Sequence, residues 1–246
     1  MERRRMSAWK NIKVVETEDL HDRVRVFHNR TDAGMRLAQL LKEYGEASFD
    51  AGDAILMAIP AGGVPVAAEI ARELRLPLDV LTVSKITPSW NTEVGYGAVA
   101  FDGTVWYDEE MAARMSLSQA EIKSGIERAM TKVQRREKLL RGDRPVPDVS
   151  GKTVIVVDDG LASGVTMTVA VGALKNAGAG TIVVAVPTAH TESIQRLAGK
   201  ADAVYCPNIR GGWQFAVAEA YERWTDVDEQ EEKRFLDAEF SRRAKK

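Results

Sequence analysis

Residues 154–167 read VIVVDDGLASGVTM, and this stretch decides the fold of the chain. Apolar β-forming residues run into two adjacent carboxylates, Asp158 and Asp159, and then into a short loop of small residues. A helix is predicted over 165–177, because apolar residues recur there at helical spacing and Gly178 supplies a C-terminal stop. The pattern therefore predicts a strand, a turn and a helix whose N-terminus faces the turn.

The predicted turn has the composition of an anion-binding loop. The first N–H groups of a helix lack intrahelical acceptors and lie at the positive end of its dipole, so small residues there let a phosphate approach. Ser163 and Thr166 can add hydroxyl donors, whereas Asp158 and Asp159 can only accept and suit vicinal hydroxyls or a hydrated Mg²⁺. An acidic pair beside such a loop indicates a sugar phosphate, with hydroxyls and metal at one end and phosphate at the other.

A second strand, glycine loop and helix precedes the first. Residues 54–59 form a continuous apolar run, as expected of a strand buried in a parallel sheet, and they enter PAGGVP at 60–65 before a helix predicted over 66–75. The loop is either a tight strand-to-helix turn or a second phosphate site. Lys85 follows the next predicted strand, 78–83, and is either a surface charge or a cation facing a pyrophosphate.

The central stretch resembles the PRPP-binding motif of type I phosphoribosyltransferases, where PRPP is 5-phosphoribosyl 1-pyrophosphate. Further segments narrow the resemblance to the stand-alone predicted phosphoribosyltransferases of bacteria and archaea, over about residues 27–226. They are FHNRTDAGMRLAQLL, LMAIPAGGVPVAAEIA, the Lys85 region, VAVPTA and WQFAVAEAYERW. The resemblance implies an α/β fold: a twisted, mainly parallel sheet with helices on both faces, a β-hairpin and lid insertion, and a small C-terminal helical cap.

The resemblance also implies roles for individual residues. Asp158, Asp159 and Lys85 are the expected catalytic residues, and the two aspartates are also expected to hold Mg²⁺, directly or through water. The substrate-binding positions are expected in the two loops. Pyrophosphate is expected at the earlier loop, at Ala61, Gly62 and Gly63. The 5-phosphate is expected at the later loop, whose substrate-binding positions are Gly160, Ala162, Ser163, Gly164, Val165 and Thr166. The implied reaction transfers the 5-phosphoribosyl group from PRPP to an unidentified acceptor, a nucleobase or related nitrogen heterocycle, and releases pyrophosphate.

This chain departs from that group at two positions. Its members commonly carry Arg where this chain has Ala61, and Thr where it has Ser163. Serine keeps the hydroxyl, but alanine removes a cation from the pyrophosphate loop. The departure leaves open a PRPP- or nucleotide-sensing protein that binds without turnover, and another phosphosugar enzyme such as a phosphatase or isomerase is a further alternative. Neither loop reads G-x-G-x-x-G or G-x-x-x-x-G-K-[ST], which argues against dinucleotide oxidoreductases and P-loop NTPases.

The length of the chain fits one α/β domain with appendages, or one domain with a small subdomain. The 246 residues include 34 Lys and Arg against 36 Asp and Glu, a net charge of −2, so no nucleic-acid or membrane-surface partner is expected. The single Cys206 cannot form an internal disulfide, and no signal peptide or membrane-spanning run is predicted. We expect a cytoplasmic protein that binds small molecules and forms a homo-oligomer, with a dimer favoured.

The remaining elements are predicted from local pattern. A single domain is expected over 1–226, with a lid at 86–97, a hairpin around Asp102 and Gly103 that ends near 107, and a long helix over 118–141. Residues 227–246 form a charged tail that is helical in part. Other strands are predicted at 12–15, 24–27, 181–186 and 203–206, and other helices at 31–45 and 214–224. His190 is more simply a loop residue than a base, and Trp213 and Phe215 are candidates for stacking on the acceptor or for core packing.

Overall fold

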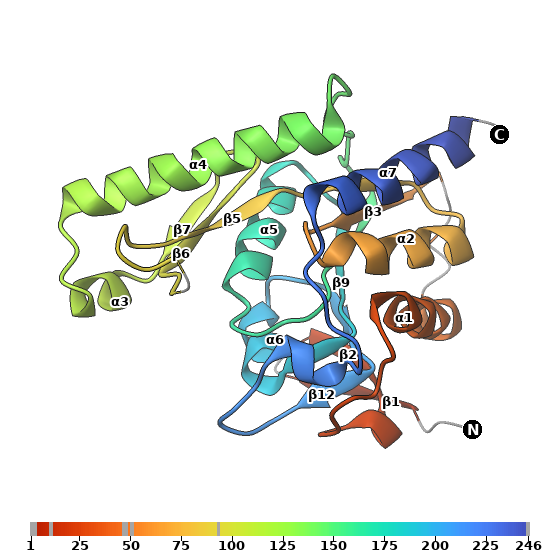
Figure 1. The fold of residues 1–246 in the computed structure, drawn as a ribbon. Helices are drawn as coiled ribbons and strands as arrows, with labels where there is room; N and C mark the ends of the chain where they lie inside the picture. The colour runs from red at the N-terminus through yellow and green to blue at the C-terminus, as the bar shows by residue number, and fades with distance from the viewer. Residues whose placement is uncertain (1–3, 10–11, 46–48, 50–51, 93, 245–246) are drawn as a thin grey trace.

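A seven-stranded sheet forms the centre of the molecule (Figure 1). The computed structural model describes residues 4–9, 12–45, 49, 52–92 and 94–244. The strand order is β1-β2-β11-β9-β8-β3-β4, and every neighbouring pair is parallel except β1 and β2. The predicted, mainly parallel sheet is therefore confirmed. Its strands are β1 (Arg4–Trp9), β2 (Ile12–Thr17), β3 (Ala54–Ala58), β4 (Leu78–Val80), β8 (Thr153–Val157), β9 (Thr181–Ala185) and β11 (Ala203–Tyr205).

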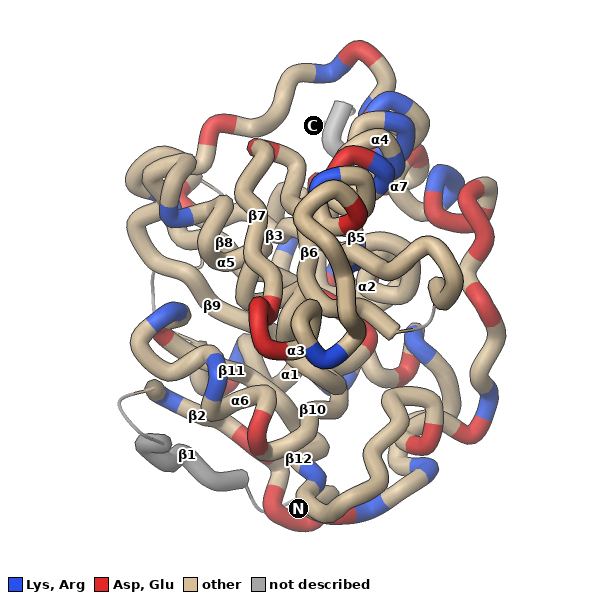
Figure 2. Tube along the Cα trace, turned by 90° about the vertical axis from the view of Figure 1, so that its left-hand side faces the viewer, with Lys and Arg blue, Asp and Glu red and all other residues tan. Residues whose placement is uncertain are grey.

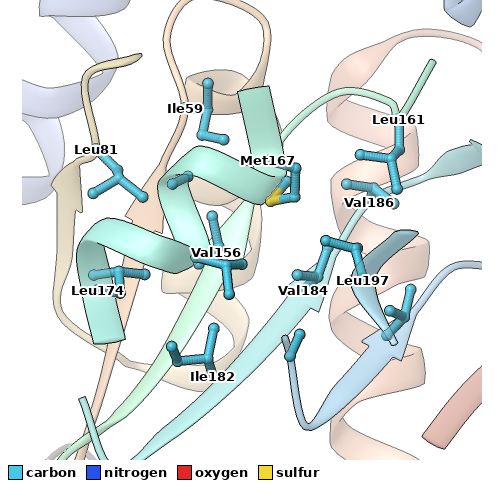
Figure 3. Packing of buried hydrophobic residues seen from close by; sticks show 14 of the residues in the cluster. Ile59, Leu81, Val156, Leu161, Met167, Leu174, Ile182, Val184, Val186 and Leu197 are labelled. Carbon is cyan, nitrogen blue, oxygen red and sulfur yellow. The ribbon is translucent and has the colours of Figure 1, made fainter. Parts of the chain in front are cut away.

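Helices cover both faces of this sheet, as predicted. The helices α1 (Arg30–Tyr44), α2 (Gly63–Leu74) and α7 (Glu229–Ala244) pack on one face, and α5 (Val165–Asn176) packs on the other (Figure 1). Successive residues of a strand point to opposite faces, so Val156 joins the cluster under α5 while Val157 joins the cluster under α1 and α2. Figure 3 shows Val156 and Ile182 packed with Met167 and Leu174 of α5.

An arm with a small core of its own projects from the domain (Figure 1). Its three antiparallel strands pack against two helices, and Ser118 and Glu121 form the predicted capping box at the start of the longer one. The predicted turn at Asp102 and Gly103 joins two of the strands, which confirms the hairpin. The arm comprises β5 (Val83–Ile86), β6 (Gly97–Ala100), β7 (Val105–Tyr107), α3 (Glu109–Arg114) and α4 (Gln119–Arg141). Residues 87–96 join β5 to β6, position 93 lies outside the described residues, and lid motion there stays a prediction.

Two predicted elements are wrong for a shared reason. Residues 24–27 form no strand and 214–224 form no helix, because the two segments bond to each other instead. The amide of Phe27 donates to the carbonyl of Ala220 at 3.0 Å, and the carbonyl of Phe27 accepts from Glu222 at 2.8 Å. This pairing leaves only a short 3₁₀ turn, Val217–Ala220, in the second segment. Backbone groups that serve a distant segment cannot also form helical hydrogen bonds.

A small two-stranded sheet and a short helix lie beside the 3₁₀ turn at Val217–Ala220. The strands β10 (Thr188–His190) and β12 (Asn208–Arg210) are parallel, and α6 (Thr191–Leu197) follows β10 directly. None of these three was predicted. Leu161 forms an isolated bridge with Ala189, so this substructure is attached to the loop that follows β8.

The charged C-terminal segment folds as α7 and packs on the domain. Leu236 of this helix is fully buried against the domain, and Asp228 caps the first turn by accepting from the amide of Glu231. Arg135 and Arg136 of α4 form ion pairs with Glu229 and Glu232 of α7, and Figure 2 shows both signs of charge along these two helices. Arg135 and Arg136 therefore serve contacts within the chain. No helix in the described residues is long and apolar enough to cross a bilayer.

Candidate active site

The two predicted loops leave the same edge of the sheet side by side. β3 and β8 are parallel neighbours with Ala58 opposite Val157, and the amide of Ile59 donates to the carbonyl of Val157 at 2.8 Å. Both strands end at this level, so residues 60–63 and 158–166 both begin there. Ligands of open parallel sheets bind at the carboxyl ends of the strands. The structure therefore places both loops where such a ligand would lie.

The glycines of the first loop pack against the acidic pair. A β-carbon at Gly63 would lie 2.6 Å from the carbonyl oxygen of Val157 and 2.9 Å from Cα of Asp158. At Gly62 the nearest atoms belong to the carboxylate of Asp159. The peptide bond between Pro60 and Ala61 is cis. Residues without side chains are thus needed for the two loops to approach each other this closely.

The second loop is exposed, and one of its own side chains turns back onto it, because the hydroxyl of Ser163 accepts from the amide of Val165 at 3.4 Å. Ala162 and Ser163 are exposed, and Gly164 has a φ of +75°, in the left-handed region that favours glycine. The hydroxyl of Ser193 donates to the carbonyl of Ala162, which attaches the loop to α6. The loop ends at Val165 and Thr166, the first two residues of α5, whose N–H groups have no acceptor within that helix. At the other end of the loop, Gly160 lies against Val217.

Burial sets the electrostatics of the acidic pair. It raises the pKa of Asp158 well above its usual range, and the neighbouring charge of Asp159 raises it further. Burial also raises the pKa of Asp159, although the guanidinium of Arg30 opposes this shift. Oδ1 of Asp158 accepts from the amide of Asp159 at 2.8 Å, which fixes one carboxylate oxygen. The two carboxylates therefore form one coupled unit.

Two residues that the sequence did not indicate hold Asp159. Nε and Nη2 of Arg30 each lie 2.9 Å from Oδ2 of Asp159, and the phenol of Tyr221 donates to the Asp159 carbonyl at 2.6 Å. Burial raises the pKa of the Tyr221 phenol well above its usual range, so it remains a donor. One signal could have identified Arg30: a cation in the first turn of a helix is unfavourable beside the dipole, so it needs another partner. The helix begins at Arg30 with Asn29 as its N-cap, one residue before the start of the range 31–45 predicted for it.

Lys85 lies on the arm, whereas Ala61 lies in the first loop. Lys85 lies on β5, where the chain leaves the sheet edge for the arm, and its exposed side chain runs beside Gly95. In the described part of the chain it makes no ion pair with either loop. Ala61 is partly exposed in the first loop. The cationic role of Lys85 and the binding role of Ala61 both remain predictions.

A cavity of about 770 Å³ borders the second loop. Phe215 and the fully exposed Trp213 line this cavity together with Ala162 and Ser163. Nε2 of His190 is 2.9 Å from the carbonyl oxygen of Gly212, which can only accept, so Nε2 carries the proton and a neutral ring keeps Nδ1 as an acceptor. The described residues that line the cavity are Ala162, Ser163, His190, Thr191, Glu192, Gly211, Gly212, Trp213 and Phe215.

The donor set is consistent with a hydrated Mg²⁺. Among the described residues no cluster of three or more His, Cys, Asp or Glu side chains could hold a metal ion. Asp158 and Asp159 supply two carboxylates, and Mg²⁺ is commonly bound by one or two carboxylates together with waters and substrate phosphates. The pair therefore fits Mg²⁺ bound together with a phosphorylated substrate better than a permanently bound structural metal.

Comparison with known proteins shows which family the chain belongs to. The sequence model described as phosphoribosyl transferase domain matches residues 26–220. Two Mycobacterium tuberculosis proteins, both named "Putative phosphoribosyl transferase" (MT0597 and Rv0571c), are 33% identical over 214 residues, which is 87% of this chain and 47% of theirs. The chain thus spans about half the length of these curated relatives. The crystal structure of TT1426 from Thermus thermophilus superposes with a TM-score of 0.67 at 30% identity, over 85% of this chain and 97% of that one.

Proposed function

The chain belongs to the phosphoribosyltransferase family, and on that premise we propose that it binds PRPP with Mg²⁺ and transfers the 5-phosphoribosyl group to a nitrogen acceptor. In this reaction the acceptor nitrogen forms a bond to C1 of the ribose, and pyrophosphate leaves with the electron pair of the C–O bond. The observation that carries the proposal is the direct packing of the Gly62–Gly63 backbone against Asp158 and Asp159. A ligand that spans both loops would have its sugar over the place where the two loops meet.

Each part of the site has a proposed role. The carboxylates of Asp158 and Asp159 accept hydrogen bonds from the ribose hydroxyls, and their negative charge stabilises the positive charge that develops on the sugar. The loop from Ala162 to Thr166 binds the 5-phosphate through backbone N–H groups and hydroxyls. Gly62 offers its backbone N–H group to the pyrophosphate, and Gly63, whose own amide donates to the carbonyl of Ile59 at 3.1 Å, leaves room for the group by having no side chain. Such a reaction depends on positioning and charge more than on covalent chemistry.

Mg²⁺ would be held at the acidic pair through water and by the oxygens of the substrate. When bound, it supplies positive charge that stabilises the departing pyrophosphate. Lys85 is proposed as a further cation for that group, brought close by movement of the arm. Because Ala61 offers no charge in the first loop, this positive charge has to come from elsewhere.

The acceptor is proposed to bind in the cavity beside Ala162 and Ser163. Phe215 and Trp213 provide aromatic surfaces on which a planar ring can stack. Of the described residues that line the cavity, only His190 and Glu192 are titratable, and none is Lys or Arg. We therefore expect a neutral or basic nitrogen heterocycle, since a carboxylated acceptor would meet Glu192 without a compensating cation.

Calorimetry followed by an activity assay tests the proposal. The wild-type protein is titrated with PRPP in the presence of Mg²⁺, and pyrophosphate release is then measured with a panel of neutral, basic and carboxylated heterocycles. Binding followed by acceptor-dependent release supports the transferase. Binding without release favours the second candidate, a PRPP- or nucleotide-sensing protein, for which the absence of a cation at Ala61 is the supporting observation. A protein that does not bind PRPP contradicts the transferase and a PRPP sensor, and leaves only a sensor of other nucleotides.

We also propose a homodimer in which the arm contributes contacts. Val105 and Trp106 of β7 are partly exposed apolar side chains, as is Trp90 in the segment that joins β5 to β6. Sedimentation at several protein concentrations measures the oligomeric state, and Trp106→Ser is expected to weaken association if this strand lies in the interface.

A further inference from the structure

Arg30 makes the two carboxylates of the acidic pair unequal. Its Nε and Nη2 groups converge on a single oxygen, Oδ2 of Asp159, both at 2.9 Å. The side chains of Arg30 and Asp159 are only 10% and 16% exposed, so the pair is largely removed from water. Asp158 forms no ion pair with any residue that the structure describes. One negative charge of the pair is thus neutralised by a direct contact, and the other is not.

The guanidinium of Arg30 is held from three sides. Nη1 donates to the carbonyl of Thr225 at 2.7 Å, and the guanidinium carbon lies 3.9 Å from the centre of the Trp224 ring. Stacking on an aromatic face and a planar set of donors together define its position, which a lysine ammonium could not reproduce. Arg30 is therefore fixed before any ligand binds, and it fixes the side chain of Asp159 in turn.

The charge balance bears on what the pair can bind. With both carboxylates ionised, Asp158, Asp159 and Arg30 together carry a net charge of −1. A single net negative charge attracts a free divalent cation only weakly. The same arrangement suits two neighbouring hydroxyls, because a diol needs fixed acceptors and no net charge. Oδ2 of Asp159 also lies directly beside Gly62. The fixed carboxylate is thus at the junction of the two loops.

We propose that Arg30 is a positioning residue that confines the acidic pair to recognition of the ribose diol, so that the pair does not capture Mg²⁺ by itself. This inference rests on the proposed function for the identity of the sugar. It assigns Mg²⁺ to the complex with pyrophosphate, with the acidic pair contacting it only through water or through the ribose hydroxyls. The charge of Arg30 then controls the affinity for Mg²⁺ alone, and the geometry of its donors controls the affinity for PRPP.

Two substitutions separate those consequences. Arg30→Gln removes the charge, so Mg²⁺ alone is expected to bind measurably, and affinity for PRPP with Mg²⁺ is expected to fall roughly 10- to 100-fold, as when partners that orient binding groups are lost. Arg30→Lys keeps the charge but loses the paired donors. It is expected to weaken PRPP binding while Mg²⁺ alone still does not bind. Arg36→Gln, on the same helix and in an ion pair with Asp32, is the matched control and should change neither affinity.

A metal-free titration gives an independent readout. In EDTA, wild-type protein is expected to bind ribose 5-phosphate more tightly than 2-deoxyribose 5-phosphate, because only the former presents both hydroxyls to the pair. Arg30→Gln is expected to lose this preference and Arg36→Gln to keep it. A purely structural role of Arg30 would alter the thermal stability of the protein without a gain in Mg²⁺ affinity, so melting curves of all variants accompany the titrations.

The outcomes distinguish the inference from the proposed function. If wild-type protein binds PRPP and Arg30→Gln binds it equally well, the positioning role is wrong while the proposed function stands. If wild-type protein does not bind PRPP, the proposed function fails. The Mg²⁺ titrations still decide the charge argument in that case: equal binding of Mg²⁺ alone to wild type and Arg30→Gln would overturn it.

Discussion

Gly62 and Asp159 lie so close together that a β-carbon at Gly62 would overlap Oδ2 of the Asp159 carboxylate. Real β-carbons do not approach another atom so closely. The contact joins the loop after β3 to the loop after β8, and the same oxygen accepts from Arg30. A side chain at position 62 would therefore displace the carboxylate, the loop or both.

Gly62→Ala is expected to weaken binding of PRPP with Mg²⁺ by tenfold or more. An added methyl group in a closely packed site typically costs about 1–3 kcal/mol in shifted neighbours, and here the neighbour is a proposed ligand-binding group. Calorimetry measures the affinity. The matched control is Gly172→Ala in α5, where the nearest atom, Cγ2 of Thr104, would be 3.8 Å away. That variant should bind PRPP normally and be about 0.5–1 kcal/mol more stable, because alanine is the better helix former.

Asp159→Asn is expected to weaken binding of PRPP with Mg²⁺ while the fold stays intact. The amide keeps the shape of the side chain but removes the charge that stabilises the bound sugar and that pairs with Arg30. Circular dichroism checks the fold and calorimetry the affinity. Glu222→Gln serves as control, since Glu222 is half exposed and its carboxylate pairs with His28. An unchanged affinity in Asp159→Asn would contradict the role assigned to this carboxylate.

Around the candidate site, the sequence predicted correctly the local structure of one strand, turn and helix. The run from Val154 to Val157, the small residues up to Gly164 and the apolar spacing of α5 are neighbours in the chain, so their periodicity shows the local structure. The sequence did not predict that β3 and β8 are neighbours, and it is this neighbourhood that brings Gly62 to Asp159.

The missed contacts join segments that are far apart in sequence. Arg30 and Asp159 are separated by 129 positions, and Tyr221 and Asp159 by 62. The spacing of apolar residues along one segment cannot predict contacts between such distant residues. The helix predicted over 214–224 failed for the same reason, since the apolar spacing is helical but the backbone near Ala220 bonds to Phe27. Tertiary hydrogen bonds override a weak local preference.

Leu236→Ala is expected to lower the free energy of unfolding by about 2–5 kcal/mol, because Leu236 of α7 is fully buried and its loss leaves a cavity. The control is Val146→Ala, in the exposed connector before β8, for which a change within about 0.5 kcal/mol is expected. Urea denaturation measures both. A change below about 1 kcal/mol for Leu236→Ala would mean that α7 unfolds separately from the domain.

Cys206 is expected to be unreactive toward DTNB in the folded protein at pH 8 and reactive once the protein is unfolded. The thiol is fully buried, and burial raises its pKa well above the usual range, so the folded state holds the neutral thiol.

The same burial makes the stability of the protein depend on pH, because the thiol of the unfolded chain ionises at about pH 8.5. The stability that the neutral thiol contributes is therefore complete below that pH and is lost as the pH rises toward the folded-state value. Relative to Cys206→Ala, the free energy of unfolding of the wild type should fall by up to about 1.4 kcal/mol per pH unit above pH 8.5. Urea titrations of both proteins from pH 7 to pH 10 measure this difference, and parallel curves would show that the thiol ionises as readily in the folded state as in the unfolded one.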